Sequence, residues 1–159
     1  MEPLIEQLGY NQGVLKINLK DLSHEDSLVA PSRGGNCINW VVGHVAYARN
    51  NMLKILGKEA LWDDDSATPY QRGSKPLTAE NALTLTEIIE KYDAAQEAMI
   101  DALKGLSADE FAAKSPVSIF KGDEETVASA ITFMVFHETY HVGQTGLLRR
   151  VAGKEGAIQ

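Results

Sequence analysis

Apolar residues recur along most of the chain at the three- and four-residue spacing of amphipathic helices. No segment alternates apolar and polar residues for long enough to build a sheet. The pattern predicts four long helices, over residues 3–20, 36–56, 78–104 and 124–151, separated by stretches rich in proline and glycine. The expected fold class is therefore all-α, a four-helix bundle.

Small polar residues stand where the later helices are expected to begin. Asn36 can cap the second helix, and Thr78 or Asn81 the third, because their side chains can accept hydrogen bonds from free backbone N–H groups. Asp123 can cap the fourth helix in the same way. Glycines that follow the last three helices favour their termination at the expected ends.

The lengths of the connections indicate the order of the helices. Short links favour antiparallel neighbours, whereas residues 57–77 form a connection much longer than a tight turn. A connection of this length can run back along the bundle, so that the third helix starts at the same end as the second. We therefore expect an up-down-down-up bundle.

Length and charge narrow the class of protein. A chain of 159 residues is expected to form one domain, residues 1–159. The net charge of −7 argues against a nucleic-acid partner, since phosphates require a basic surface. No apolar run is long enough to span a membrane, no signal peptide is recognisable, and Cys37 is the single cysteine. These features favour a cytoplasmic protein that acts on a small-molecule substrate.

Three histidines carry the clearest chemical signal. His137 and His141 are four residues apart, so on a helix they share one face, with Cβ atoms about 5–6 Å apart. That face is apolar and should turn inward, and His44 lies on the corresponding face of the second helix. The three imidazoles are therefore expected to meet and to hold one divalent metal ion. Three neutral nitrogen ligands leave coordination positions open, as in reactive metal sites.

The histidines could also have a purely structural role, since each could be a core residue with its own hydrogen-bond partner. The spacing His137-Glu138-x-x-His141 also matches the zinc-protease motif. The context that a zinc protease needs is missing, because only Glu155 could supply a later ligand and no sheet is expected. Glu138 itself is a candidate catalytic base, with a structural ion pair or hydrogen bond as the alternative.

Two segments are similar to a known family. Residues 34–49 contain Trp40, Gly43 and His44, and residues 137–158 contain a His-x-x-x-His-x-Gly-Gln sequence that ends at Gln144. In this combination and order the chain resembles the DinB/YfiT-like superfamily of metalloenzymes. The resemblance implies an up-down-down-up bundle, a divalent ion such as zinc or nickel held by His44, His137 and His141, and frequent homodimers.

The resemblance leaves three functional hypotheses open. Characterised branches of the family activate a low-molecular-weight thiol, bacillithiol or mycothiol, so the first is a metal-dependent thiol S-transferase with a thiol cosubstrate. The second is a metal-dependent hydrolase that uses metal-bound water with Glu138 as the base. The third is a non-catalytic metal-binding protein with a stress or scaffold role.

Overall fold

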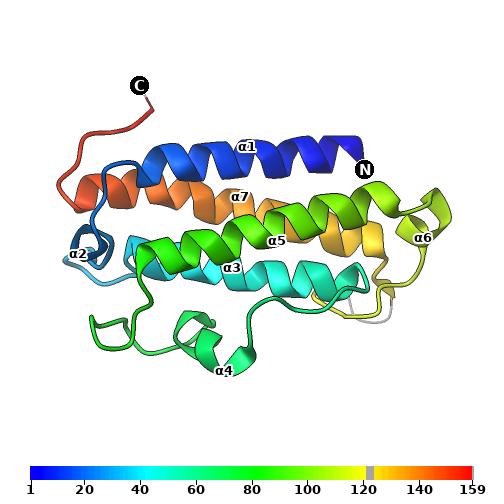
Figure 1. Cartoon of the computed structure of the whole chain (residues 1–159), viewed down its shortest axis with the longest axis horizontal. Coiled ribbons are helices and arrows are strands. Elements are labelled where there is room, and N and C mark those ends of the chain that lie inside the picture. Colours follow the sequence, from blue (N-terminus) through cyan, green and yellow to red (C-terminus); the bar gives the residue numbers. More distant parts are fainter. Residues whose placement is uncertain (121–123, 159) are drawn as a thin grey trace.

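Four long helices form the body of the molecule in the computed structural model, which describes residues 1–120 and 124–158. They are α1 (Glu2–Leu19), α3 (Ile38–Ile55), α5 (Leu85–Gly105) and α7 (Val127–Val151) (Figure 1). Within the described residues there is no β-strand, only an isolated antiparallel bridge between Lys114 and Thr126. The prediction of an all-α fold is confirmed.

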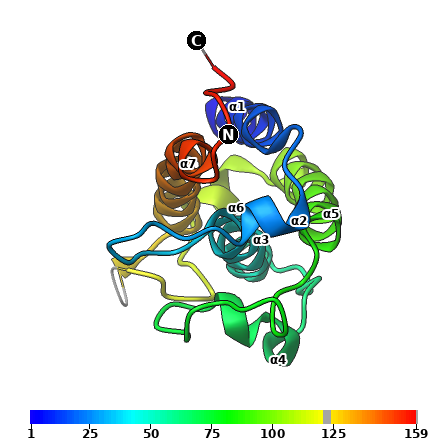
Figure 2. The ribbon, with the colours of Figure 1, turned by 90° about the vertical axis from the view of Figure 1, so that its left-hand side faces the viewer.

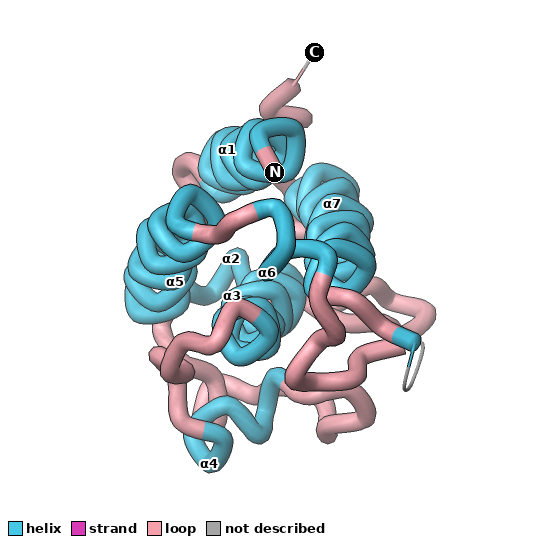
Figure 3. Tube along the Cα trace, turned by 90° about the vertical axis from the view of Figure 1, so that its right-hand side faces the viewer, coloured by secondary structure: helices cyan, strands magenta, loops and turns pink. Residues whose placement is uncertain are grey.

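The helices follow the up-down-down-up order expected from the long second connection. In Figure 1, α1 and α7 run in one direction along the bundle, and α3 and α5 run in the other. Seen along the bundle in Figure 2, α3 lies across from α1, with α5 and α7 on either side. The connection from α3 to α5 contains the short helices α4 (Asp64–Ala67) and η1 (Thr68–Tyr70) and passes outside α3 (Figure 3).

The third long helix starts later than predicted. It begins at Leu85 rather than at residue 78, so neither Thr78 nor Asn81 is its cap. Thr84 is the cap: its hydroxyl accepts the backbone N–H of Glu87, whose carboxylate accepts the backbone N–H of Thr84. This reciprocal pair satisfies two N–H groups that the helix leaves free. Upstream, Asn81 Oδ1 accepts the N–H of Thr78 at 2.7 Å and closes a separate turn.

The fourth long helix also starts a few residues later than predicted. It begins at Val127, where Thr126 and Ser129 cap it through their backbone N–H and hydroxyl groups. The expected cap, Asp123, lies outside the described residues.

The second long helix starts two residues after Asn36, which does not cap it. Its first residue is Ile38, and the preceding Cys37 makes no side-chain capping hydrogen bond. The sequence pattern also did not reveal the one-turn helices α2 (His24–Ser27) and α6 (Ala108–Ala112), each of which begins with its own capping box. Elements this short are not long enough to display a helical period.

Helix α3 is the most enclosed element of the bundle. It packs against α5 and α7 on its inner sides and against η1 on its outer side, and most of its residues are buried. Asn50 in α3 binds the backbone of Trp62 in the connection, accepting its N–H at 3.2 Å and donating to its carbonyl. Trp40 Nε1 donates to Ser74 Oγ at 2.9 Å. The connection is thus attached to α3 along its length.

Candidate metal centre

His44 is held in one orientation by two neighbours. The indole ring of Trp40, one turn earlier in α3, stacks on the imidazole with ring centroids 4.7 Å apart and planes 10° from parallel. His44 Nδ1 lies 2.8 Å from the backbone carbonyl oxygen of Tyr70. Because a carbonyl oxygen can only accept, Nδ1 carries the proton and Nε2 presents its lone pair.

Gly43 makes room for the residue that orients His44. A Cβ atom at this position would lie 2.1 Å from Cδ1 of Tyr70, so only glycine allows the tyrosine ring to lie against α3. The ring is fixed at its far end, where its hydroxyl donates to Asn39 Oδ1 at 3.0 Å and accepts the N–H of Leu83 at 2.8 Å. Gly43 therefore lets Tyr70 lie where its backbone carbonyl can orient His44.

Replacing Gly43 by alanine is expected to damage both the fold and the histidine cluster. The added methyl group must displace the Tyr70 ring, and overpacking of this kind costs about 1–3 kcal/mol, more than alanine's better helix propensity returns. Zinc affinity should fall as well, because the carbonyl that orients His44 moves with the ring. Urea unfolding and zinc titration measure the two effects.

Gly13→Ala is the matched control, since Gly13 is also helical but a Cβ there would meet nothing within 4 Å. Equal stability and equal zinc affinity of the Gly43 and Gly13 variants would contradict the assigned role of Gly43.

Helix α7 supplies the other two histidines. His137 and His141 stand on the same face, with ring centroids 4.6 Å apart. His141 Nδ1 lies 2.8 Å from Oε1 of Gln144, three residues later in the helix. Gln144 Oε1 therefore accepts a hydrogen bond from Nδ1–H of His141, as the Tyr70 carbonyl does for His44, and the lone pair on Nε2 of His141 is left to bind a metal ion.

The three histidines converge on one point between α3 and α7. His44 Nε2 and His137 Nε2 are 3.3 Å apart, and one ligand nitrogen from each histidine lies within 4.8 Å of the others. Two imidazole nitrogens bound to tetrahedral zinc at about 2.0–2.1 Å are separated by roughly 3.3 Å. The cluster thus has the donor type and spacing to bind a divalent metal ion.

Burial keeps the three imidazoles neutral. It lowers the pKa of each, and the neighbouring histidines contribute to the lowering at His44 and His137. The effect is largest for His137, whose pKa falls from 6.5 to about 4. A metal ion binds the unprotonated ring, so few protons compete for these nitrogens at neutral pH.

The metal-free protein is expected to lose stability as the pH falls from 6.5 to about 4. In this window His137 of the unfolded chain is protonated while His137 of the folded protein is still neutral, so the unfolded state binds more protons. Urea unfolding of the metal-free protein across this range measures the loss. His137→Gln should reduce it, and an identical pH dependence in the variant would assign the acid sensitivity to other groups.

Glu138, the candidate base, is held in a buried network outside the histidine cluster. Arg49 of α3 makes two hydrogen bonds to its carboxylate, at 2.8 and 2.9 Å, and both side chains are almost fully buried. Tyr92 of α5 donates to Oε1 at 3.0 Å, and Asn11 of α1 donates to the same oxygen at 3.3 Å. The carboxylate therefore joins all four long helices.

Sequence reasoning missed the three partners of Glu138, of which Arg49 is the charged one. Its guanidinium also donates to the backbone carbonyl of Tyr92 at 2.7 Å and lies over that tyrosine ring, 3.4 Å from the centroid. A charged residue inside the otherwise apolar segment around His44 was the available signal. Arg49 follows His44 in the sequence, and Glu138 lies between the other two histidines. Because the histidine segments were expected to meet, an ion pair between these two opposite charges could have been predicted.

Two cavities border the histidine cluster, one toward each end of the groove between α3 and α7. The larger, of about 540 Å³, is lined by His44 and His137 and extends toward Phe120 and Arg72. The smaller, of about 380 Å³, is lined by His141 together with neighbours such as Trp40, Tyr140 and Gln144. A small molecule can therefore approach the cluster from either end of the groove.

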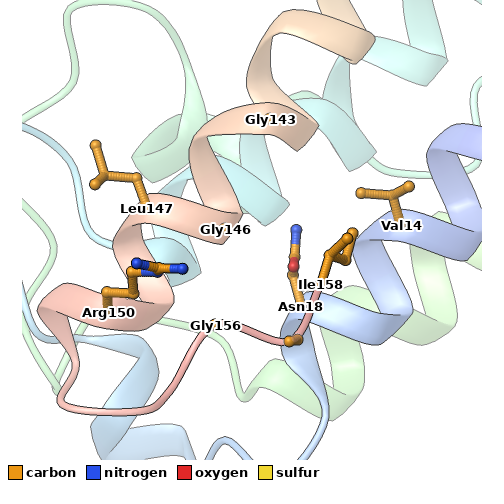
Figure 4. A pocket seen from close by; sticks show the side chains of 9 residues that line it. Val14, Asn18, Gly143, Gly146, Leu147, Arg150, Gly156 and Ile158 are labelled. Carbon is orange, nitrogen blue, oxygen red and sulfur yellow. The ribbon is translucent and has the colours of Figure 1, made fainter.

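A third hollow lies away from the histidines, between α1 and α7. Figure 4 shows that Val14 and Asn18 of α1 face Leu147 and Arg150 of α7 across it, with Ile158 of the C-terminal segment on one side. Its volume is about 350 Å³, and none of the described residues that line it is a histidine.

The fold and the cluster together define a helical-bundle protein with a candidate three-histidine metal centre. The sequence matches the DinB superfamily over residues 7–145, so the chain belongs to that superfamily. The family resemblance inferred from the two histidine segments is confirmed.

A solved structure agrees with the fold. The chain is similar to the crystal structure of a conserved protein from Enterococcus faecalis, with a TM-score of 0.76 and 14% identity, over 96% of this chain and 97% of that one. Among curated proteins no match was found. No helix in the described part of the chain is long and apolar enough to cross a membrane.

Proposed function

We propose that this protein binds one divalent metal ion through His44, His137 and His141 and is a metal-dependent transferase that activates a small thiol. The observation that carries the proposal is the convergence of three neutral imidazoles beside a cavity. His44 and His137 line that cavity, so a ligand held in it reaches the cluster directly.

A divalent ion held by three imidazoles would lower the pKa of a bound thiol and make a thiolate available at neutral pH. The chain's own residues prepare the site for this. The Tyr70 carbonyl and Gln144 Oε1 accept hydrogen bonds from Nδ1 of His44 and His141, which fixes the rings and makes their Nε2 atoms stronger metal ligands. Zinc and nickel both accept imidazole ligands, and either satisfies the proposal.

A hydrolase remains the second enzymatic hypothesis, and its weak point is the base. Both oxygens of Glu138 already accept hydrogen bonds from Arg49, and Oε1 accepts further ones from Tyr92 and Asn11. A carboxylate committed in this way is poorly placed to take a proton from a reacting molecule. The transferase needs no protein carboxylate, since the proton of the thiol passes to solvent.

The transferase is tested with a simple thiol and an aromatic chloride. 2-Mercaptoethanol and 1-chloro-2,4-dinitrobenzene give a thioether: the sulfur–carbon bond forms, chloride leaves with the electron pair of the carbon–chlorine bond, and the thiol proton goes to the buffer. Zinc-loaded or nickel-loaded protein should accelerate this reaction above the rate of the same thiol without protein, as followed by absorbance.

The metal-free protein and His141→Ala are the controls and should give only the background rate. A rate that is the same with and without bound metal would contradict the transferase. Cleavage of 4-nitrophenyl acetate without thiol, by the metal-loaded protein alone, would favour the hydrolase. Metal binding with neither reaction would favour a non-catalytic metal-binding protein.

A further inference from the structure

We propose that the larger cavity beside the histidines is a subsite for a small anionic molecule that carries a flat aromatic or other apolar group. This ligand class rests on the proposed function, because the cavity opens on the histidines that would hold the metal. The cavity of about 540 Å³ lies within the usual range for small-molecule sites, about 300–1,000 Å³.

A row of rings leads from the outer wall of the cavity to the histidine cluster. Phe120 stacks on Phe133 with centroids 4.9 Å apart and planes 14° from parallel. Phe133 is followed by His137 at 6.5 Å, and His137 by His44 at 5.2 Å. Although Phe120 and Phe133 belong to the wall, Phe120 is 69% exposed. An exposed ring in this position offers a face on which a flat apolar group can stack.

The remaining polar wall of the cavity carries unused hydrogen-bond donors. Asn51 and Arg72 line it, and neither side chain has a hydrogen bond or ion pair with any residue in the described ranges, 1–120 and 124–158. An arginine side chain has donors only, in a planar fork that fits a carboxylate, sulfonate or phosphate. The group that Arg72 selects is therefore an anion.

Asp64, an acidic residue that contacts two residues of this wall, already has partners. Tyr47 donates to Asp64 Oδ1 at 2.8 Å, and Lys54 lies 4.0 Å from the same oxygen. Gln71 donates to the backbone carbonyl of Asp64 and to the Tyr47 hydroxyl, both at 3.3 Å. Asp64 thus holds the wall in place through Tyr47 and Gln71, and Arg72 keeps its charge free for a ligand.

The second cavity differs in the one respect that decides where an anion binds. Among the described residues, no lysine or arginine lines it. The net charge of the chain is −7, so a local positive group is needed to attract an anion. Of the two cavities at the cluster, only the one with Arg72 supplies it.

The test uses 2-naphthalenesulfonate, which is flat, anionic and a weak metal ligand, and its neutral counterpart 2-naphthylmethanol. Isothermal titration calorimetry on the full-length protein gives the dissociation constant of each probe, once with zinc and once without it. Arg72→Met should weaken sulfonate binding about tenfold and leave the alcohol unchanged, because it removes a charge-assisted hydrogen bond but keeps an apolar stem. Arg72→Lys should retain most of the affinity.

Two further variants locate the site. Phe120→Ala should weaken the binding of both probes about three- to tenfold, because both lose the same stacking surface. Arg150→Met is the matched control: Arg150 is another exposed arginine, but it lines the hollow between α1 and α7 (Figure 4). This variant should bind both probes as the unchanged protein does. Absence of saturable binding, or equal sulfonate affinity in the Arg72→Met protein, would overturn the proposal.

The outcome is separable from that of the proposed function. Sulfonate binding that depends on Arg72 but persists in a protein unable to hold zinc would support the subsite and contradict the metal site. Zinc binding without Arg72-dependent sulfonate binding would support the metal site and contradict the subsite.

Discussion

Replacing any one of His44, His137 or His141 by alanine is expected to lower zinc affinity at least 100-fold. Partners that merely orient a ligand histidine are worth about 10–100-fold in affinity, and loss of a ligand itself should exceed that. The three donor nitrogens lie within 4.8 Å of one another, so each removal leaves the ion with only two imidazoles. Zinc titration against a competing chelator, followed by elemental analysis of the purified proteins, measures the effect.

His24→Ala is the matched control, because His24 is the remaining histidine of the sequence and lies outside the cluster. It should bind zinc as the unchanged protein does. Circular dichroism verifies that each variant is folded before its metal content is compared. Full zinc retention in all three cluster variants would mean that the histidines are core residues and not ligands.

Arg49→Met is expected to destabilise the fold by about 3–5 kcal/mol. The substitution leaves the carboxylate of Glu138 buried without its charged partner, and breaking a buried ion pair from one side costs about this much. Glu138→Gln should destabilise the protein for the converse reason. The double variant Arg49→Met/Glu138→Leu should recover part of the loss, since no charge remains buried. Urea unfolding gives the free energies.

A surface ion pair supplies the comparison. Lys16 Nζ lies 2.9 Å from Asp93 Oδ2, but the side chains are 50% and 33% exposed. Lys16→Met should therefore cost less than about 1 kcal/mol. Losses of the same size at Arg49 and Lys16 would contradict a structural role for the buried pair. Unchanged stability of Glu138→Gln with loss of hydrolytic turnover would instead restore Glu138 as a base.

Helical periodicity was enough to predict the bundle, because the buried residues of α1, α5 and α7 recur every three or four positions. The order of the helices followed from one connection too long to be a turn. The starts of α5 and α7 could not be predicted as well, since several small polar residues precede each of them. The choice of Thr84 over Thr78 depends on a glutamate three residues later, which completes a reciprocal cap.

Of the candidate site, the sequence could predict the three histidines but not the groups that orient them. The four-residue spacing of His137 and His141, and the apolar face around His44, were sufficient to predict the cluster. Tyr70 was not predicted, because it acts through its backbone carbonyl, which leaves no trace in the side-chain pattern. The native metal, the thiol, the homodimer and the cytoplasmic location stay predictions.

The attachment of the long connection to α3 has a consequence for chain entropy and for changes in loop length. Trp62, Tyr70 and Ser74 each bind a side chain of α3, so residues 57–84 behave as several short loops rather than one long loop. The entropy of loop closure is then divided among short segments, and each attachment makes the next one easier to form. Insertions between the attachment points should leave His44 where it is, whereas a deletion that shifts Tyr70 would withdraw its carbonyl from the imidazole.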